Sequence, residues 1–357
     1  MFKCKPDYEQ AQKRINAFWN CEETDRPVTY MQFAKENVTP FVYKKYNSFD
    51  EQWLDLEYRA EEQTFYMENT VFYADAMPVA WPNLGPSVFS AWAGCPHFFG
   101  EYTAWADPFI KDWATDADKA VIDFNHPLFK ALEKYTKLLL EKSKDNFITG
   151  LTDLHPGGDH LAALRDSAQL AIDLLEEPEA VKAKIKSSNQ EYFKVVDYFT
   201  KMIKDAGQTP ISTWTTITSE KTMYVPSNDF SCMISADMFR EFFLEGLAEE
   251  CRHLDETIYH LDGPGAIRHV DALLEIKELN AIQWVPGAGN DGHVKWMELY
   301  KKIQAGGKGL QIMSAMPEDL PLLMENLSPN GLWITVHGVN NADEAENVMK
   351  IIDKWGK

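Results

Sequence analysis

Two residues that can bind a metal ion or move a proton lie two positions apart at the end of a predicted strand. In the segment Thr257–Gly265, His260 and Asp262 point to the same side of an extended chain, because side chains alternate along a strand. The turn Gly263–Gly265 then ends the strand. In a barrel of parallel strands, catalytic residues gather at the carboxyl ends of the strands. The alternative is structural: a buried, hydrogen-bonded histidine and an aspartate that caps the next helix.

The elements that would position these residues alternate along the whole chain. Tyr8–Trp19 is predicted to be a helix, since its apolar residues recur at helical spacing. The eight predicted strands are Pro27–Phe33, Val71–Met77, Phe147–Asp153, Pro210–Ile217, Thr257–Leu261, Ala281–Val285, Gly309–Met313 and Gly331–Val336. Strands that alternate with helices predict an α/β fold, here a single (β/α)8 TIM barrel over residues 1–357 with an N-terminal helical extension over residues 1–26. The stretch Pro78–Trp113 has no regular periodicity and is predicted to be a long loop.

The composition excludes several classes of protein. The chain has 357 residues, of which 45% are hydrophobic and 25% are charged, and its net charge is -20. Binding to nucleic acid or to an anionic membrane surface would need a basic patch, and the longest basic runs are pairs of lysines. The five cysteines have no paired spacing, and the sequence shows neither a signal peptide nor an apolar run long enough for a membrane span. We therefore expect a cytoplasmic protein without disulfide bonds.

Polar side chains follow most of the predicted strands, and in a barrel they would face one cavity. Besides His260 and Asp262, they include Asp75, Asp153, His155, Trp214, Gln283 and His337. His337 ends the eighth predicted strand, so it could join His260 and Asp262 in a site of two histidines and one carboxylate. Zinc with an open fourth position, or an octahedral metal, would accept such a set. The alternative is that His260 and Asp262 pair with each other or with nearby backbone.

Each of the other candidates also has a structural alternative. Asp75 lies in an otherwise apolar strand, so it is either a functional carboxylate or the buried partner of an arginine or lysine. The segment Asp153–His155 leads into a flexible turn and could line the cavity or begin the next helix. Asp229 could reach the cavity or cap a turn. Trp214 and Tyr224 could stack on a flat ligand or pack in the core.

Four segments resemble the uroporphyrinogen decarboxylase superfamily. These segments are His260–Gly265, Asp153–Arg165, Asp229–Ser235 and Val336–Gly338. The resemblance covers nearly the whole chain, from the N-terminal helix to Trp355, and it implies a single TIM barrel. The superfamily contains the decarboxylases of haem synthesis. It also contains zinc-dependent methyltransferases that move methyl groups between corrinoid proteins and thiols such as coenzyme M.

The decarboxylase branch holds substrate carboxylates with arginines that follow the first strand. The corresponding segment Tyr30–Asn37 contains no arginine, so that clamp is missing here. Asp75 and His337 are nevertheless similar to the Asp and His that this branch uses, which implies catalytic roles for both. A metal-free decarboxylase of a porphyrinogen or a smaller carboxylate is therefore an alternative function.

The methyltransferase branch binds zinc through His-x-Cys after the fifth strand and a Cys near the eighth. Here His260, Asp262 and His337 stand at these places, so harder ligands replace the thiolates. The resemblance implies zinc or another divalent metal on these three residues, and transfer of a methyl group between a small methylated compound and a corrinoid (cobalamin) partner protein. The predicted substrate-binding residues are Asp153, His155, Trp214, Tyr224, Asp229 and Gln283. A corrinoid- or tetrapyrrole-binding protein without turnover is a third possibility, and a homodimer is left open.

Overall fold

A mixed seven-stranded sheet forms the centre of the molecule, in the order β2-β1-β13-β12-β11-β10-β9. The computed structural model describes residues 2–290 and 292–355. The strands of this sheet are β1 (Val28–Ala34), β2 (Thr70–Ala74), β9 (Met223–Tyr224), β10 (Glu256–Asp262), β11 (Ala281–Val285), β12 (Gly309–Ala315) and β13 (Leu332–Val336). Neighbouring strands are parallel, except that β2 runs antiparallel to β1.

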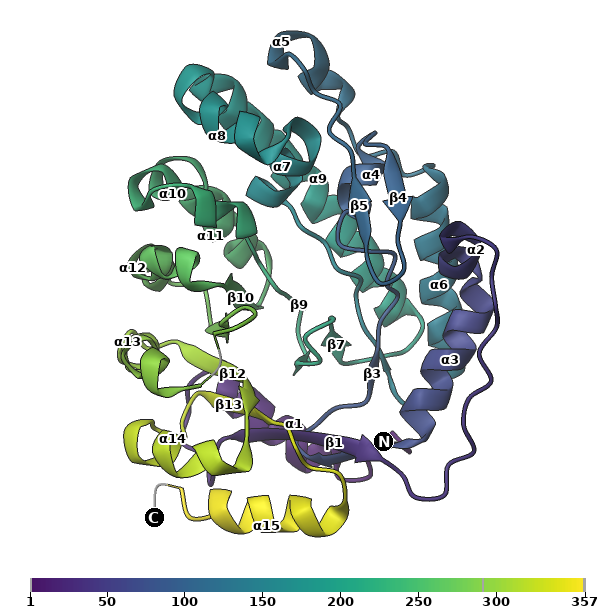
Figure 1. Ribbon diagram of the computed structural model, residues 1–357, viewed down its shortest axis with the longest axis vertical. Helices are drawn as coiled ribbons and strands as arrows, with labels where there is room; N and C mark the ends of the chain where they lie inside the picture. The colour runs from purple at the N-terminus through teal and green to yellow at the C-terminus, as the bar shows by residue number, and fades with distance from the viewer. Residues whose placement is uncertain (1, 291, 356–357) are drawn as a thin grey trace.

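Six shorter strands of the described ranges lie outside this sheet, and β7 is drawn next to β9 whereas β4 and β5 lie beside α4 (Val88–Trp92) (Figure 1). They form three pairs: β3 (Val79–Ala80) parallel to β6 (Ile148–Thr149), β4 (His97–Phe99) antiparallel to β5 (Ala104–Ala106), and β7 (Ile211–Ser212) antiparallel to β8 (Thr218–Ser219). The backbone N–H of Leu151 donates to the carbonyl of Ser212 over 2.7 Å, so β7 lies beside the chain that leaves β6.

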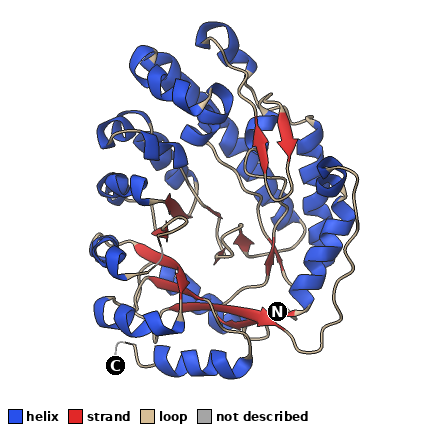
Figure 2. Ribbon diagram, in the orientation of Figure 1, coloured by secondary structure: helices blue, strands red, loops and turns tan. Residues whose placement is uncertain are grey.

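Helices surround these strands on the outside (Figure 2). They are α1 (Tyr8–Trp19), α2 (Phe49–Leu54), α3 (Leu56–Glu68), α4 (Val88–Trp92), α5 (Trp113–Asp116), α6 (Pro127–Ser143), α7 (Gly157–Arg165), α8 (Ser167–Glu176), α9 (Pro178–Asp205), α10 (Ala236–Phe242), α11 (Leu244–His253), α12 (Val270–Glu275), α13 (Met297–Ala305), α14 (Leu320–Asn326) and α15 (Ala342–Ile352). Short 3-10 helices cover Ala117–Lys119, Asp229–Met233, Pro264–His269, Val294–Trp296 and Pro317–Asp319.

Elements with a strong local pattern are confirmed. The helix α1 has the predicted bounds, and its apolar residues at helical spacing are buried. The strand β11 also has the predicted bounds. Serine is a residue type favoured at the start of a helix, and Ser235 caps α10: its side chain accepts a hydrogen bond from the backbone N–H of Met238 over 3.2 Å. Local periodicity and capping are therefore sufficient to place these elements.

The second predicted strand, Val71–Met77, differs from the expectation. It ends at Ala74, whose φ of 55° lies in the left-handed region, and Asp75 then donates its backbone N–H to the carbonyl of Thr29 over 2.9 Å. The chain turns there, and the next strand β3 pairs with β6. The predicted loop Pro78–Trp113 contains α4, β3, β4 and β5. The α/β fold is observed, whereas a closed barrel of eight parallel strands stays a prediction.

Two expectations from the composition can be compared with the structure. The five cysteines are free thiols, as their spacing predicts. No helix in the described ranges is long and apolar enough to cross a membrane.

Candidate metal centre

Three side chains bring possible metal-ligand atoms together at the end of β10. They belong to Asp229, His260 and Asp262, and one ligand atom from each lies within 4.8 Å of the other two. His260 and Asp262 occupy the partly exposed side of β10, as the alternation of side chains predicts. The backbone N–H of His260 donates to the carbonyl of Pro226 over 2.9 Å. This bond holds the segment that leads to Asp229 beside β10.

Hydrogen bonds fix the orientation of the His260 ring. Its Nδ1 lies in hydrogen-bond contact with Oε1 of Gln283, and Nε2 of Gln283 donates to Oε1 of Gln311 over 2.8 Å. Because a carbonyl oxygen can only accept, Nδ1 carries the proton and the lone pair resides on Nε2. The Trp214 ring packs against the imidazole at 81°, with the ring centroids 5.2 Å apart. Gln283 and Trp214 therefore contact His260, and their role in substrate binding stays a prediction.

A second histidine, His155, lies between two carboxylates near the cluster. Its Nε2 is 2.9 Å from Oδ1 of Asp153, and its Nδ1 is 2.9 Å from Oγ of Ser227 and 3.8 Å from Oδ2 of Asp159. Burial lowers the pKa of His155, but the charges and hydrogen bonds of Asp153 and Asp159 outweigh it and raise that pKa well above 6.5. Asp159 also accepts the backbone N–H of Asp229 over 3.0 Å, so this network anchors one member of the cluster.

The Asp229 carboxyl lies in a crowded acidic environment. Asp229 is exposed to solvent. Loss of hydration around its carboxyl, followed by the negative charge of Asp159, raises the pKa of Asp229 to about 6, while His260 and His155 act in the opposite direction. A cation placed among these carboxylates would reduce their mutual repulsion.

A cleft of about 570 Å³ opens beside the cluster. Its lining includes Asp229, His155 and Asp159, together with Trp105 from β5 and Met233. Trp105 is 50% exposed and Met233 is 55% exposed, so both offer apolar surface to a ligand. Neither was a candidate, although Trp105 lies in the predicted loop Pro78–Trp113. A larger hollow of about 980 Å³ lies against α2 and β4, away from the predicted site residues.

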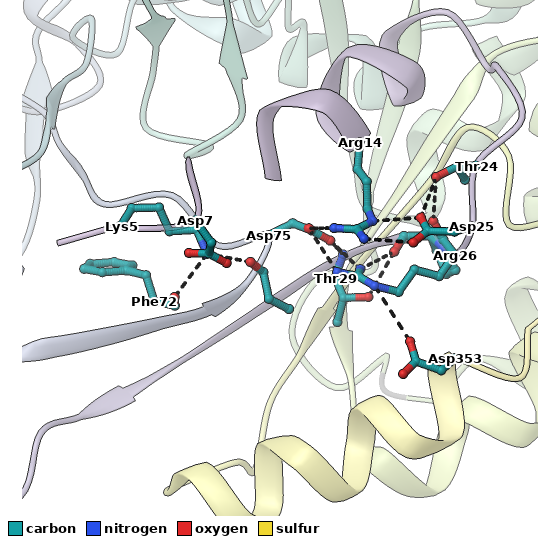
Figure 3. A network of polar contacts seen from close by, with 12 residues as sticks. Lys5, Asp7, Arg14, Thr24, Asp25, Arg26, Thr29, Phe72, Asp75 and Asp353 are labelled. Atoms are coloured by element: carbon teal, nitrogen blue, oxygen red, sulfur yellow. Dashed lines mark hydrogen bonds and ion pairs between the residues drawn. The ribbon is translucent and has the colours of Figure 1, made fainter. Parts of the chain in front are cut away.

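Asp75, predicted to be catalytic, lies in a buried ion-pair network instead (Figure 3). Its side chain is 0% exposed and contacts the guanidinium of Arg26 through both oxygens. Nη1 of Arg14 lies 3.2 Å from Oδ1, and the backbone N–H of Thr29 donates to Oδ2 over 2.9 Å. The structure thus gives Asp75 the second of its two predicted roles, as the buried partner of arginines.

His337 and Tyr224 also differ from their predicted roles. His337 is exposed and lies outside the cluster, and its Nε2 contacts the carbonyl of Met313 over 2.9 Å. The group of ligand atoms that lie within 4.8 Å of one another contains Asp229 in place of the predicted His337. The Tyr224 hydroxyl donates to the carbonyl of Thr152 over 2.6 Å and accepts from the N–H of Leu154 over 2.5 Å. Tyr224 is fully buried, which makes it a core residue.

Replacing Gln283 tests whether this side chain positions His260. In Gln283→Leu, the Nδ1–H of His260 loses its acceptor, and we expect the affinity for zinc to fall by about 10- to 100-fold. Gln283→Glu keeps an oxygen acceptor and should retain most of the affinity. Competition with a chelator measures both values, and circular dichroism verifies the fold. Equal affinities for the two variants would contradict a positioning role.

Comparison with known proteins gives a likeness of fold. No family model matches the sequence, and no curated protein matches it either. Among solved structures, the chain is similar to a methyltransferase from Methanosarcina mazei, with a TM-score of 0.58 and 10% sequence identity. The alignment covers 97% of this chain and 99% of that chain. At this identity the likeness shows a shared fold over nearly the full length.

Proposed function

We propose that the chain is a methyltransferase that moves a methyl group between a small methylated compound and a corrinoid carrier protein, with a divalent metal held by Asp229, His260 and Asp262. The observation that carries this proposal is the cluster of three ligand atoms within 4.8 Å of one another at the end of β10. The nearly full-length similarity to a methyltransferase structure supports the reaction class. The four segments that resemble the uroporphyrinogen decarboxylase superfamily support the corrinoid partner.

The chemistry of the donor set fits a divalent ion such as zinc. Ligand atoms bound to one zinc ion lie about 3–4 Å apart, so small rotations would bring these side chains into range. One imidazole and two carboxylates leave a further coordination position open. A divalent ion bound there supplies a Lewis acid that polarises the group carrying or accepting the methyl. Because these ligands are harder than thiolates, we expect that group to be an oxygen or nitrogen function.

The protein side chains around the cleft would bind and orient the methylated compound. Trp105 and Met233 offer exposed apolar surface. His155 lines the same cleft, where its ring nitrogens contact Asp153 and Ser227, so it would form part of the polar side of the cleft. The methyl would move as a cation equivalent: cobalt(I) supplies the electron pair for the new bond, and the donor heteroatom keeps the pair of the broken bond.

A metal-free decarboxylase receives less support from the site. That alternative needs Asp75 to act on substrate, and both oxygens of Asp75 are engaged by arginines and by backbone. A corrinoid-binding protein without turnover remains the other outcome of the experiment below.

Methyl transfer to free cob(I)alamin tests the proposal directly. The protein is loaded with zinc and mixed with a panel of small methylated oxygen and nitrogen compounds, and formation of methylcobalamin is followed by its absorption spectrum. We expect transfer from at least one donor, with loss of the reaction after chelation and in Asp262→Asn. Asp237→Asn, which removes an exposed carboxylate of α10, is the matched control and should behave as the unchanged protein. Stoichiometric zinc without transfer from any donor would favour the binding protein.

A further inference from the structure

A small, partly open hollow, here called the void, lies next to the candidate metal centre, between α9, α11 and the segments 157–158 and 227–228. Its volume is about 10 Å³. Three side chains that line it, Asn189, Asn228 and Glu250, are 1%, 3% and 2% exposed. Their oxygens Oδ1, Oδ1 and Oε2 have no hydrogen-bond partner in the part of the chain that the structure describes. Buried acceptors are paired in nearly all native proteins, so we expect a bound particle in this void.

Two glycines of the surrounding backbone pack closely against the amide groups of Asn189 and Asn228. Nδ2 of Asn189 donates to the carbonyl of Gly246 over 3.2 Å, and in the described part of the chain its Oδ1 has no partner. A Cβ atom added at Gly246 would lie 3.0 Å from that Nδ2. A Cβ atom added at Gly158 would lie 2.3 Å from Oδ1 of Asn228. The absence of a side chain at these two glycines therefore leaves room for the two amide groups.

We infer that this void binds one desolvated monovalent cation, Na⁺ or K⁺, through Asn189, Asn228 and Glu250. The space suits a single particle of about the size of a water molecule. All three unpaired atoms are hard oxygens, the ligands that such ions prefer. One carboxylate balances one positive charge, whereas a divalent ion would leave a buried excess charge.

A water molecule is the competing occupant, and it would pair with fewer of the three oxygens. Water donates two hydrogen bonds, so one of three acceptors stays unpaired unless Glu250 takes up a proton. Burial raises the pKa of Glu250 well above 4.5, and the charge of Asp159 adds to the effect. A proton and a cation therefore compete for the same carboxylate, and the experiment below separates them.

An ion in this void would stabilise the two segments that carry the candidate metal centre. Gly157 and Gly158 precede Asp159, and Asn228 precedes Asp229. Because Asn189 comes from α9 and Glu250 from α11, one ion would join both helices to the segment that carries Asn228. The inference does not rest on methyl transfer, since it concerns a separate set of oxygens.

Thermal unfolding in defined salts tests the inference. The full-length protein is dialysed into choline chloride, and KCl or NaCl then replaces choline at constant ionic strength. We expect Tm to rise saturably, by a few degrees, with K⁺ or with Na⁺ and not with choline. An equal Tm in all three salts would overturn the cation site, and it would favour a water molecule with a protonated Glu250.

Two variants assign the effect to this void. Glu250→Gln has nearly the same shape but no charge, so the salt-specific rise in Tm should disappear. Glu249→Gln removes the same charge from the neighbouring position of α11 and should keep the rise. A full response to K⁺ or Na⁺ in Glu250→Gln would place the ion elsewhere and overturn the inference. The salt series on the unchanged protein remains decisive if Glu250→Gln does not fold.

Discussion

His260→Ala should remove the metal from the protein and abolish metal-dependent methyl transfer. The imidazole Nε2 is the one nitrogen ligand in the cluster, and alanine offers no atom to replace it. Loss of a supporting residue around a metal typically costs about 10- to 100-fold in affinity, so the loss of a ligand should cost more. Elemental analysis after dialysis against zinc should show near-stoichiometric metal in the unchanged protein and almost none in the variant.

The same experiment distinguishes the set of ligands in the structure from the set predicted by the sequence. Asp229→Asn should weaken zinc binding, because Asp229 belongs to the cluster. His337→Ala should leave zinc binding unchanged, because His337 is not one of the three residues of the cluster. If His337→Ala loses the metal and Asp229→Asn keeps it, the sequence-based set was correct and the cluster is not the metal centre.

Asp75→Asn should be strongly destabilising. Asp75 is fully buried and pairs with Arg26 and Arg14, so the substitution leaves buried guanidinium groups without their counter-charge. Breaking a buried ion pair by removing one partner costs about 3–5 kcal/mol of unfolding free energy. Asp25→Asn is the matched control: Asp25 pairs with Arg14 over 2.8 Å but is 64% exposed, and exposed pairs contribute about 0–1 kcal/mol. Denaturant unfolding measures both values.

Zinc binding and activity, measured at denaturant concentrations well below the unfolding transition, complete this experiment. If Asp75 is structural, the folded fraction of Asp75→Asn should bind zinc with the affinity of the unchanged protein. A variant that is as stable as the parent but inactive would instead restore Asp75 as a catalytic group, and with it the metal-free decarboxylase.

Local sequence patterns determined a large part of the secondary structure. The spacing of apolar residues is sufficient for α1, and Ser235 is sufficient for the start of α10, since capping and periodicity act within a few residues. The strand pattern also placed His260 and Asp262 on one side of β10, because the alternation of side chains is a property of the backbone itself. These conclusions needed no information on contacts between distant segments.

The tertiary structure alone decided which distant residues meet. Asp229 lies about thirty positions before His260 in the chain, and the backbone bond from His260 to Pro226 brings it to the end of β10. Asp75 has the same functional group as Asp229, but its carboxylate forms ion pairs with two arginines of the N-terminal segment. A carboxylate has no local signature for either role, because its chemistry depends on which charges and donors surround it after folding. The antiparallel direction of β2 has the same origin, in pairing between segments far apart in the sequence.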